Sequence, residues 1–225
     1  MTRFSLDVLY EDNHLIAVNK AAGVATMGAR AGEETLVALV KQYIKRKYKK
    51  PGNVYLGVVS RLDAPVTGVV VLARTSKAAA RLSRQFAEGT VEKVYRAIVE
   101  KAPNPAAGQC VDWLLKSERE RRMKVVRPGT AGAREARLSY RTLRKLPRGC
   151  LIEVRPATGR KHQIRLQLAH RGWLIVGDAK YGSERRFEGG LALHARSLRF
   201  EHPVTKAAVE LVAEVPKSWK EFGVD

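Results

Sequence analysis

The sequence predicts a mixed α and β fold in one domain, with many short strands and few helices. Residues 69–73 are a continuous run of valine, leucine and alanine, which is typical of a buried strand. Between residues 36 and 44, apolar side chains recur at the spacing of a helix. Residues 92–152 consist mostly of short apolar stretches interrupted by proline, glycine and basic turns, as expected for strands with short connections.

A hairpin and a helix are expected at the start of the chain. Residues 7–19 hold two apolar runs around a polar turn, the pattern of two antiparallel strands. Thr35 is in position to cap the N-terminus of the helix that follows. This helix ends in the basic run 45–50, whose cations suit the negative end of the helix dipole. The run is either a solvated helix end or a contact for phosphates, and both interpretations stay open.

A second helix is expected after the apolar run at residues 69–73. Thr75 or Ser76 is its N-cap, and Gly89 ends it. The other expected elements are a short helix over residues 162–170 and two strands, near residues 191–200 and 208–213. We find no internal repeat, low-complexity tract or linker, so a single domain over residues 1–225 is expected.

The charge of the chain indicates its class of partner. The 42 Lys and Arg residues against 22 Asp and Glu give a formal net charge of +20. Such an excess favours a phosphate backbone, because each neutralised phosphate releases counterions. Membrane binding is the competing interpretation, but no stretch approaches the roughly 18 apolar residues of a transmembrane helix, and no signal peptide is recognisable. Two distant cysteines predict neither a zinc site nor a disulfide framework, so a cytoplasmic protein is expected.

One carboxylate is a candidate catalytic group. Asp63 follows Arg61 by two residues and precedes a turn that contains Pro65 and Gly68, immediately before the apolar run at residues 69–73. An acid in so basic a chain is often a working group. Alternatively, Asp63 is a surface residue that pairs with Arg61. From these residues alone, neither interpretation is favoured.

A second motif surrounds the short helix expected near residue 162. Thr158 or Gly159 leaves a strand and begins this helix, whose N-terminal amides favour an anion. His162 and Arg165 share one face of the helix. This face is a candidate clamp for nucleic acid or for a carboxylate. The alternative is an ordinary solvated face of an amphipathic helix.

Tyr95 belongs to an alternating segment in which it shares one strand face with Lys93 and Ala97. A tyrosine at such a position packs into a core or stacks on a base. The chain contains no Walker A, GxGxxG, HExxH or GxSxG sequence. Nucleotide, dinucleotide, zinc-protease and nucleophile-elbow sites are therefore unsupported.

The motifs together resemble those of the RluA-type pseudouridine synthases, over nearly the whole chain. The catalytic loop of that family typically reads His-Arg-Leu-Asp, followed by two variable residues, a Thr/Ser-Gly turn and an apolar strand. Here residues 60–63 read Ser-Arg-Leu-Asp, and Thr67-Gly68 precede the apolar run. The segment 158–165 resembles the second family motif. Ser60 replaces the usual histidine and Pro65-Val66 replace the usual Asp-Thr, but the aspartate is present.

The resemblance implies an α+β pseudouridine-synthase fold, a mixed and largely antiparallel sheet with flanking helices and a central active-site cleft. It implies a monomeric enzyme that isomerises uridines in rRNA or tRNA, without cofactor or metal and without a DNA or membrane partner. Asp63 would be the nucleophile, Arg165 its ionic partner, and Tyr95 the ring that stacks on uracil. The residues implied to bind RNA are Arg61, Thr67, Arg160, Lys161, His162 and Gln163.

Two other functions stay open at this point. One is a non-catalytic RNA-binding or ribosome-assembly factor on the same scaffold, because a fold does not guarantee a function. The other is a base-excising glycosylase, which also flips bases and uses an aspartate but does not account for the second motif. The presence of Asp63, Tyr95 and Arg165 favours the synthase.

Overall fold

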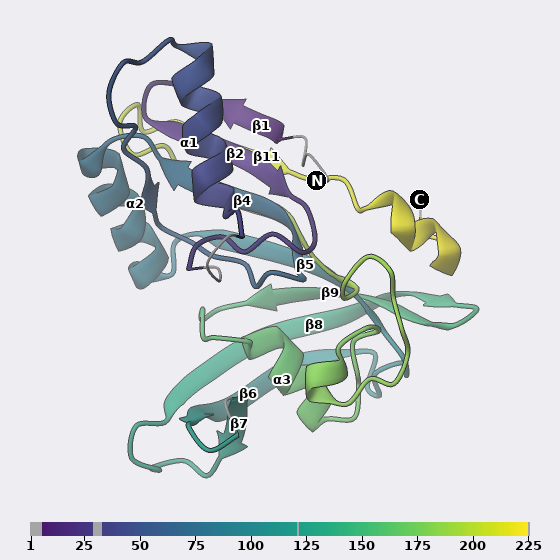
Figure 1. Ribbon diagram of the computed structural model, residues 1–225. Helices are drawn as coiled ribbons and strands as arrows, with labels where there is room; N and C mark the ends of the chain where they lie inside the picture. Colours follow the sequence, from purple (N-terminus) through teal and green to yellow (C-terminus); the bar gives the residue numbers. More distant parts are fainter. Residues whose placement is uncertain (1–5, 29–32, 121, 225) are drawn as a thin grey trace. The chain divides into compact units, whose positions relative to one another are not determined.

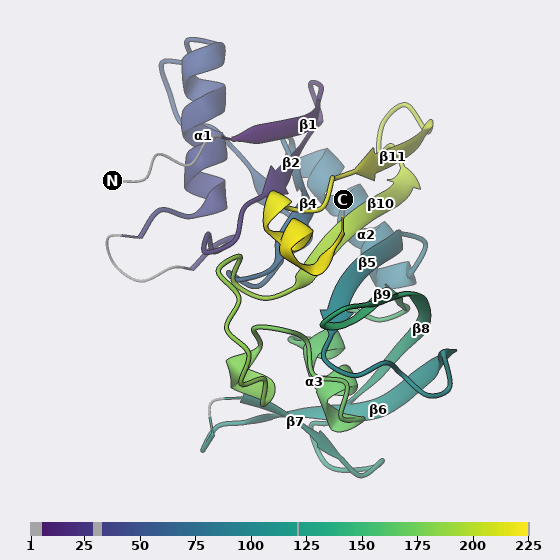
Figure 2. The same ribbon diagram turned by 90° about the vertical axis from the view of Figure 1, so that its right-hand side faces the viewer.

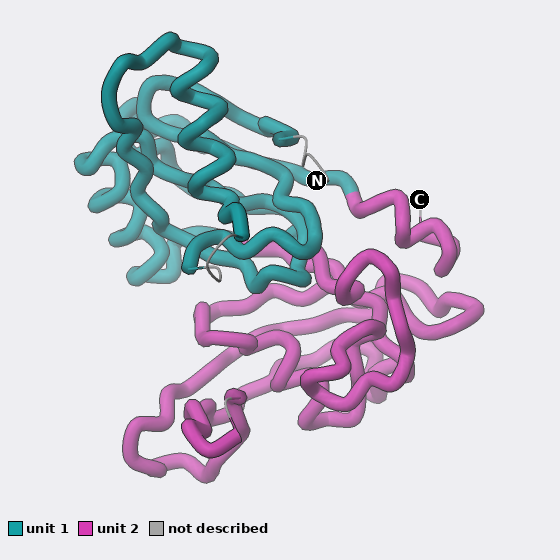
Figure 3. Tube along the Cα trace, in the orientation of Figure 1, with its two compact units in different colours: residues 1–92, 195–214 teal, residues 93–194, 215–225 magenta. Residues whose placement is uncertain are grey.

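The structure, a computed structural model, describes residues 6–28, 33–120 and 122–224 (Figure 1). The chain packs as two compact units (Figure 3). Unit 1 comprises residues 1–92 and 195–214, and unit 2 comprises residues 93–194 and 215–225. The expectation of one catalytic domain stays a prediction alongside this division. Among the described residues, no helix combines the length and apolar character needed to cross a bilayer.

Unit 1 is a largely antiparallel sheet with two helices. Its strands follow the order β1-β2-β4-β10-β11, and β3 also pairs with β4. Residues of β10 from Ala195 onward belong to this unit. The bounds are β1 (Asp7–Glu11), β2 (Leu15–Lys20), β3 (Gly57–Val58), β4 (Thr67–Ala73), β10 (Leu193–Glu201), β11 (Ala208–Val212), α1 (Leu36–Lys47) and α2 (Ser76–Glu88). The predicted hairpin is confirmed by the antiparallel pairing of β1 with β2.

Strand β4 is buried along its whole length because a helix covers each face of the sheet around it. On one face, Val69 and Val71 pack with Leu82 of α2. On the other face, Val70 and Leu72 join the core that contains the buried side of α1. Figure 2 shows α1 and α2 on opposite sides of β2 and β4. This arrangement explains why the segment is uniformly apolar instead of alternating.

Capping residues define the two helices of unit 1 as predicted. The hydroxyl of Thr35 accepts a hydrogen bond from the Ala38 amide at 3.2 Å, and the hydroxyl of Thr75 accepts one from the Ala78 amide at 3.2 Å. Each bond satisfies an amide that the helix itself leaves without a partner. Gly89 ends α2 in the left-handed conformation, with φ of 75°.

The strands of unit 2 are antiparallel and follow the order β5-β9-β8-β6-β7. Its bounds are β5 (Glu92–Val99, of which Glu92 is assigned to unit 1), β6 (Ala107–Ser117), β7 (Arg122–Val126), β8 (Arg134–Leu146), β9 (Gly149–Pro156), α3 (Gln163–His170), and the short 3-10 helices η1 (Ala179–Tyr181) and η2 (Lys217–Phe222). Helix α3 is attached to the sheet through Gln167, whose amide donates to the carboxylate of Asp112 at 2.7 Å and to the Ala136 carbonyl at 3.1 Å.

The start of α3 differs from the prediction. The helix begins at Gln163, and Thr158 and Gly159 lie in the preceding loop. His162 is the N-cap, with φ of 53° and no side-chain capping bond. Sequence patterns do not reveal a histidine in the left-handed region, because few non-glycine residues adopt it.

Candidate active site

Asp63 lies in the loop between β3 and β4 of unit 1. The Val66 amide donates to the Asp63 carbonyl at 3.0 Å and closes a tight turn. The Asp63 side chain is half-buried, and Arg61 is exposed. Thr67, the first residue of β4, is buried. The loop is therefore held at its C-terminal end by the most deeply buried strand of the unit.

Gly68 allows β4 and β10 to approach each other closely. Its φ is +110°, and a Cβ atom at this position would lie 2.3 Å from the carbonyl oxygen of Ala195. Such a contact is far inside van der Waals distance, and the backbone conformation itself favours glycine. The glycine that follows the Asp63 loop thus fixes where β4 starts relative to β10.

Lys20, at the end of β2, is a buried cation next to the same loop. Its ammonium group donates to the carbonyls of Ala21 at 2.9 Å, Val24 at 2.8 Å and Ala64 at 2.9 Å. Burial lowers the pKa of Lys20 to about 7, and the negative charge of Asp63 acts in the opposite direction. Lys20 was not among the predicted site residues, and the signal that the sequence offers is its position two residues after the apolar run 15–18.

Arg165 is buried on α3 of unit 2 and binds a carboxylate there. Its Nε and one terminal nitrogen donate to the two oxygens of Asp178, each at 2.7 Å. The guanidinium carbon lies 5.2 Å from the centre of the Tyr181 ring. The side chain is 7% exposed, so the alternative of a solvated helix face is wrong for this residue. The bidentate pair fixes the plane of the guanidinium group. The pairing of Arg165 with Asp63, which lies in the other unit, stays a prediction.

Asp178 was not among the predicted site residues. In the sequence it appears only within a loop bounded by Gly177 and Gly182, which indicates a turn and nothing more. Both glycines have positive φ, of 85° and 105°. The loop brings Asp178 and Tyr181 to α3, where Nδ1 of His162 lies 2.7 Å from the Tyr181 hydroxyl.

The loop before α3 is held together by Gln163. Its side-chain oxygen accepts from the Thr158 hydroxyl at 2.7 Å and from the Arg160 amide at 2.9 Å. Its amide nitrogen donates to the Arg137 carbonyl at 3.0 Å. Gln163 is buried, Arg160 is half-buried with its Nε bonded to the Glu135 carbonyl, and Lys161 is exposed. The structure thus gives Gln163 a role in shaping this loop, while its predicted contact with RNA stays a prediction.

Tyr95 lies on the sheet face that carries α3. It pairs with Val154 of β9, and Val154 pairs with Tyr140 of β8. Alternation along β8 puts Ala136 on the same face as Tyr140, and Ala136 is opposite Asp112, the residue that binds α3. Tyr95 is half-buried. Within unit 2, Tyr95 therefore lies on the same face of the sheet as helix α3, which carries Arg165.

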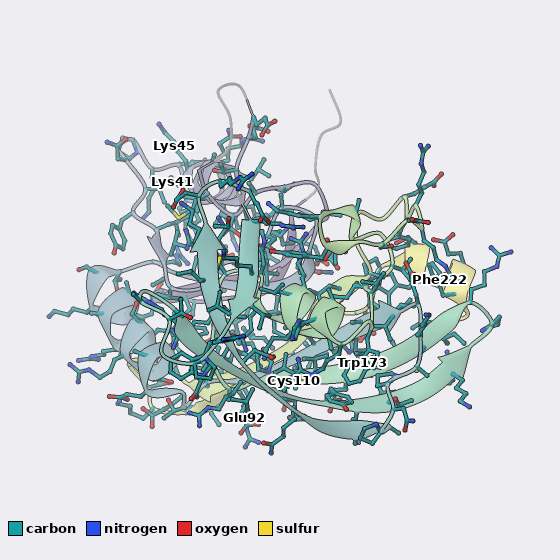
Figure 4. The ribbon with its side chains drawn as sticks, turned by 90° about the horizontal axis from the view of Figure 1, so that it is seen from below. Lys41, Lys45, Glu92, Cys110, Trp173 and Phe222 are labelled. Carbon is teal, nitrogen blue, oxygen red and sulfur yellow. The ribbon has the colours of Figure 1, made fainter. Side chains whose placement is uncertain are left out.

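The basic end of α1 contains cations in two different situations. Lys47 forms an ion pair with Glu11 at 2.6 Å, and Glu11 also accepts from the hydroxyls of Tyr43 and Tyr48. Lys41 and Lys45, labelled in Figure 4, are exposed on the helix. Lys49 and Lys50 are also exposed. Lys47, although exposed itself, thus joins the end of α1 to Glu11 of β1. Within the described parts of the chain, no cluster of three or more His, Cys, Asp and Glu residues is arranged to hold a metal ion.

Comparisons with known proteins identify the family. The family model described as "RNA pseudouridylate synthase" matches residues 14–170. The chain is 33% identical to ribosomal large subunit pseudouridine synthase D of Zymomonas mobilis, over 94% of this chain and 70% of that protein. It is 30% identical to tRNA pseudouridine synthase C of Vibrio parahaemolyticus, over 99% of this chain and 95% of that protein.

A solved structure supports the fold. The structure of human RNA pseudouridylate synthase domain containing 4 matches with a TM-score of 0.79 and 26% identity, covering 97% of this chain and 94% of that chain. The predicted α+β class and the resemblance to the RluA-type enzymes are both confirmed. The chain belongs to the RNA pseudouridylate synthase family and is an RNA pseudouridine synthase.

Proposed function

We propose that this synthase converts particular uridines of rRNA or tRNA to pseudouridine, with Asp63 as the nucleophile. The observation that carries this assignment is the half-buried Asp63 carboxylate in a tight turn at the start of a fully buried strand. The relatives named above support both RNA classes, because one is named for the large ribosomal subunit and the other for tRNA. We further propose that the enzyme is monomeric and cytoplasmic and that it acts without a cofactor, a metal, or a DNA or membrane partner.

The reaction breaks the bond between uracil N1 and the ribose and forms a new bond from carbon 5 of the same uracil. Carbon 5 loses its proton and N1 gains one, so the change is an isomerisation. Asp63 attacks either carbon 6 of uracil or the anomeric carbon of ribose. The target base first leaves its stack, at a cost of a few kcal/mol. Arg61 is exposed next to Asp63 and is the proposed residue that fills the vacated space.

Residues of unit 2 are proposed to support this chemistry. Tyr95 is proposed to stack on the flipped uracil, and Arg165 is proposed to pair with the Asp63 carboxylate and orient it. The bidentate contact between Arg165 and Asp178 supports this role, since it leaves the guanidinium group with a defined orientation. Lys161 and His162 are proposed to contact flanking phosphates. Arg160 and Gln163, together with Thr67 of unit 1, are proposed to contact the RNA backbone around the target.

The RNA substrate can be identified by mapping pseudouridines in rRNA and tRNA from cells with and without this protein. We expect specific uridines to lose the modification in its absence and to regain it on expression of the wild type but not of Asp63→Asn. Loss confined to tRNA or to rRNA assigns the class. An unchanged map in both RNAs would contradict the proposed substrates.

The exposed lysines at the end of α1 are expected to set affinity rather than the choice of uridine. Each phosphate contact with single-stranded RNA adds about −0.7 to the slope of log affinity against log salt. Changing Lys45, Lys49 and Lys50 to Gln should therefore flatten the slope by roughly 2 if all three meet phosphates. Lys47 is left unchanged because it holds Glu11.

A triple variant with the same change in charge provides the control. Lys77, Lys101 and Lys217 are exposed and lie outside α1. Salt titrations of RNA binding should give this control a slope close to that of the wild type. Equal slopes for both variants would mean that the end of α1 is a solvated helix end.

A further inference from the structure

Residues 20–26 of unit 1 bind the backbone of Leu62 and Ala64, the two residues next to Asp63. On the N-terminal side, the hydroxyl of Thr26 accepts from the Leu62 amide at 3.1 Å and donates to the Leu62 carbonyl at 2.9 Å. The Leu62 carbonyl belongs to the peptide plane that it shares with the Asp63 nitrogen. A single side chain thus fixes the plane immediately before the candidate nucleophile.

The same segment also binds the carbonyl of Ala64, the residue after Asp63. The Ala64 carbonyl accepts from the Lys20 ammonium group at 2.9 Å and from the Gly23 amide at 2.9 Å. The Asp63 carbonyl accepts from Val66 at 3.0 Å. The carbonyls of three successive residues, 62 to 64, are therefore all hydrogen-bonded.

Thr26 is buried, and both hydrogen bonds of its hydroxyl go to one residue. Because Thr26 is only 3% exposed, its hydroxyl requires a hydrogen-bond partner within the protein. Both of its bonds go to the same distant residue, Leu62, and none of them supports a strand or helix ladder. A hydroxyl that served packing alone would be satisfied by any nearby carbonyl. Here donor and acceptor are both used on the backbone beside Asp63.

We propose that Thr26 is a positioning residue for the Asp63 nucleophile, acting through the backbone of Leu62, with Lys20 holding the opposite side of the loop. The inference rests on the proposed role of Asp63. A nucleophile must be held close to its attack geometry, and a displacement of about 1 Å costs on the order of 10²-fold in rate. Thr26 itself need not touch the RNA, so its effect should appear in the chemical step and not in binding.

The test is Thr26→Val, which keeps the branched shape of the side chain and removes the hydroxyl. We expect the single-turnover rate to fall by about 10- to 100-fold, while the enzyme concentration at half-saturation stays within about two-fold. Thr26→Ser restores the hydroxyl and should recover the rate to within about three-fold of the wild type. Hydrogen exchange of the Leu62 and Val66 amides should be faster in Thr26→Val than in Thr26→Ser.

Thr75→Val provides the matched control, because it makes the same chemical change, a hydroxyl replaced by a methyl group, elsewhere in the same unit. The Thr75 hydroxyl caps α2, and its loss should lower the melting temperature without reaching the loop. Its single-turnover rate should match that of the wild type once both are compared well below their melting temperatures. If Thr26→Val does not fold, Thr26→Ala replaces it, since water can then reach the Leu62 groups.

Three outcomes would overturn the inference: a normal rate for Thr26→Val or Thr26→Ala, an equal loss of rate in Thr75→Val, or a change in half-saturation with an unchanged maximal rate. Activity of Asp63→Asn separates this test from the proposed function. If Asp63→Asn is active, the nucleophile is wrongly assigned. If it is inactive while Thr26→Val turns over normally, only the positioning role fails.

Discussion

Asp63→Asn is expected to reduce pseudouridine formation by at least about 10³-fold, because an amide cannot act as the nucleophile. The affinity for RNA should stay within a few fold, since the change removes one charge and almost no surface. Single-turnover release of tritium from RNA labelled at carbon 5 of uridine measures the reaction directly, because the new bond displaces that hydrogen. Activity above about one percent of the wild type would contradict the assignment.

Two controls make the Asp63 experiment decisive. Asp63→Ala removes the possibility that asparagine deamidates back to aspartate during preparation. Unfolding by heat should be measured for both variants, because the charge of Asp63 raises the pKa of the buried Lys20. Loss of that charge should favour the neutral form of Lys20 further. A folded, RNA-binding and inactive protein is the expected result for both variants.

Arg165→Lys is expected to lose activity by about 10²-fold even though the positive charge is kept. An ammonium group is a point charge and cannot form the two parallel bonds that the guanidinium group makes to Asp178. The side chain would therefore lose the fixed orientation that its proposed role requires. Single-turnover kinetics at saturating enzyme measure this loss, and the half-saturation concentration separates it from a loss of RNA binding.

Arg171→Lys is the matched control for this substitution. Arg171 directly follows α3, and its two terminal nitrogens donate to the two carboxylate oxygens of Asp112 at 2.8 and 3.3 Å. It belongs to the same unit but has no proposed part in the reaction. Its lysine variant should turn over at nearly the wild-type rate. Similar losses in both variants would mean that Arg165 serves the stability of unit 2 and not catalysis.

The sequence predicted those parts of the fold that depend on local patterns. The apolar run of β4, the hairpin before it and the caps Thr35 and Thr75 are all recognisable within a few neighbouring residues, and all are confirmed. Asp63 was singled out for the same reason, because the turn and the apolar strand that follow it are recognisable in the neighbouring residues. Local patterns were sufficient wherever the deciding contacts lie close together in the chain.

Contacts between residues that lie far apart in the chain could not be predicted from sequence patterns. Asp178 meets Arg165 only because a loop with two left-handed glycines returns to α3. Thr26 and Leu62 form hydrogen bonds although no sequence pattern links the two segments that contain them. The helical pattern alone left open whether Arg165 is buried, because a charged residue near a helix start is usually exposed. In each case the environment of the residue depends on tertiary structure, which helix and strand propensities and hydrophobic periodicity do not describe.

The complete burial of β4 limits where substitutions can accumulate around the nucleophile. From Thr67 to Ala73 every side chain is enclosed, so a polar or larger residue there has no face on which to be accommodated. Residues 60, 64 and 65 are partly accessible, whereas Val66 is buried. Ser60 and Pro65, two residues at which this chain departs from the usual family loop, are among the partly accessible positions. The enzyme can thus diversify the residues that flank its nucleophile without disturbing the strand that supports it.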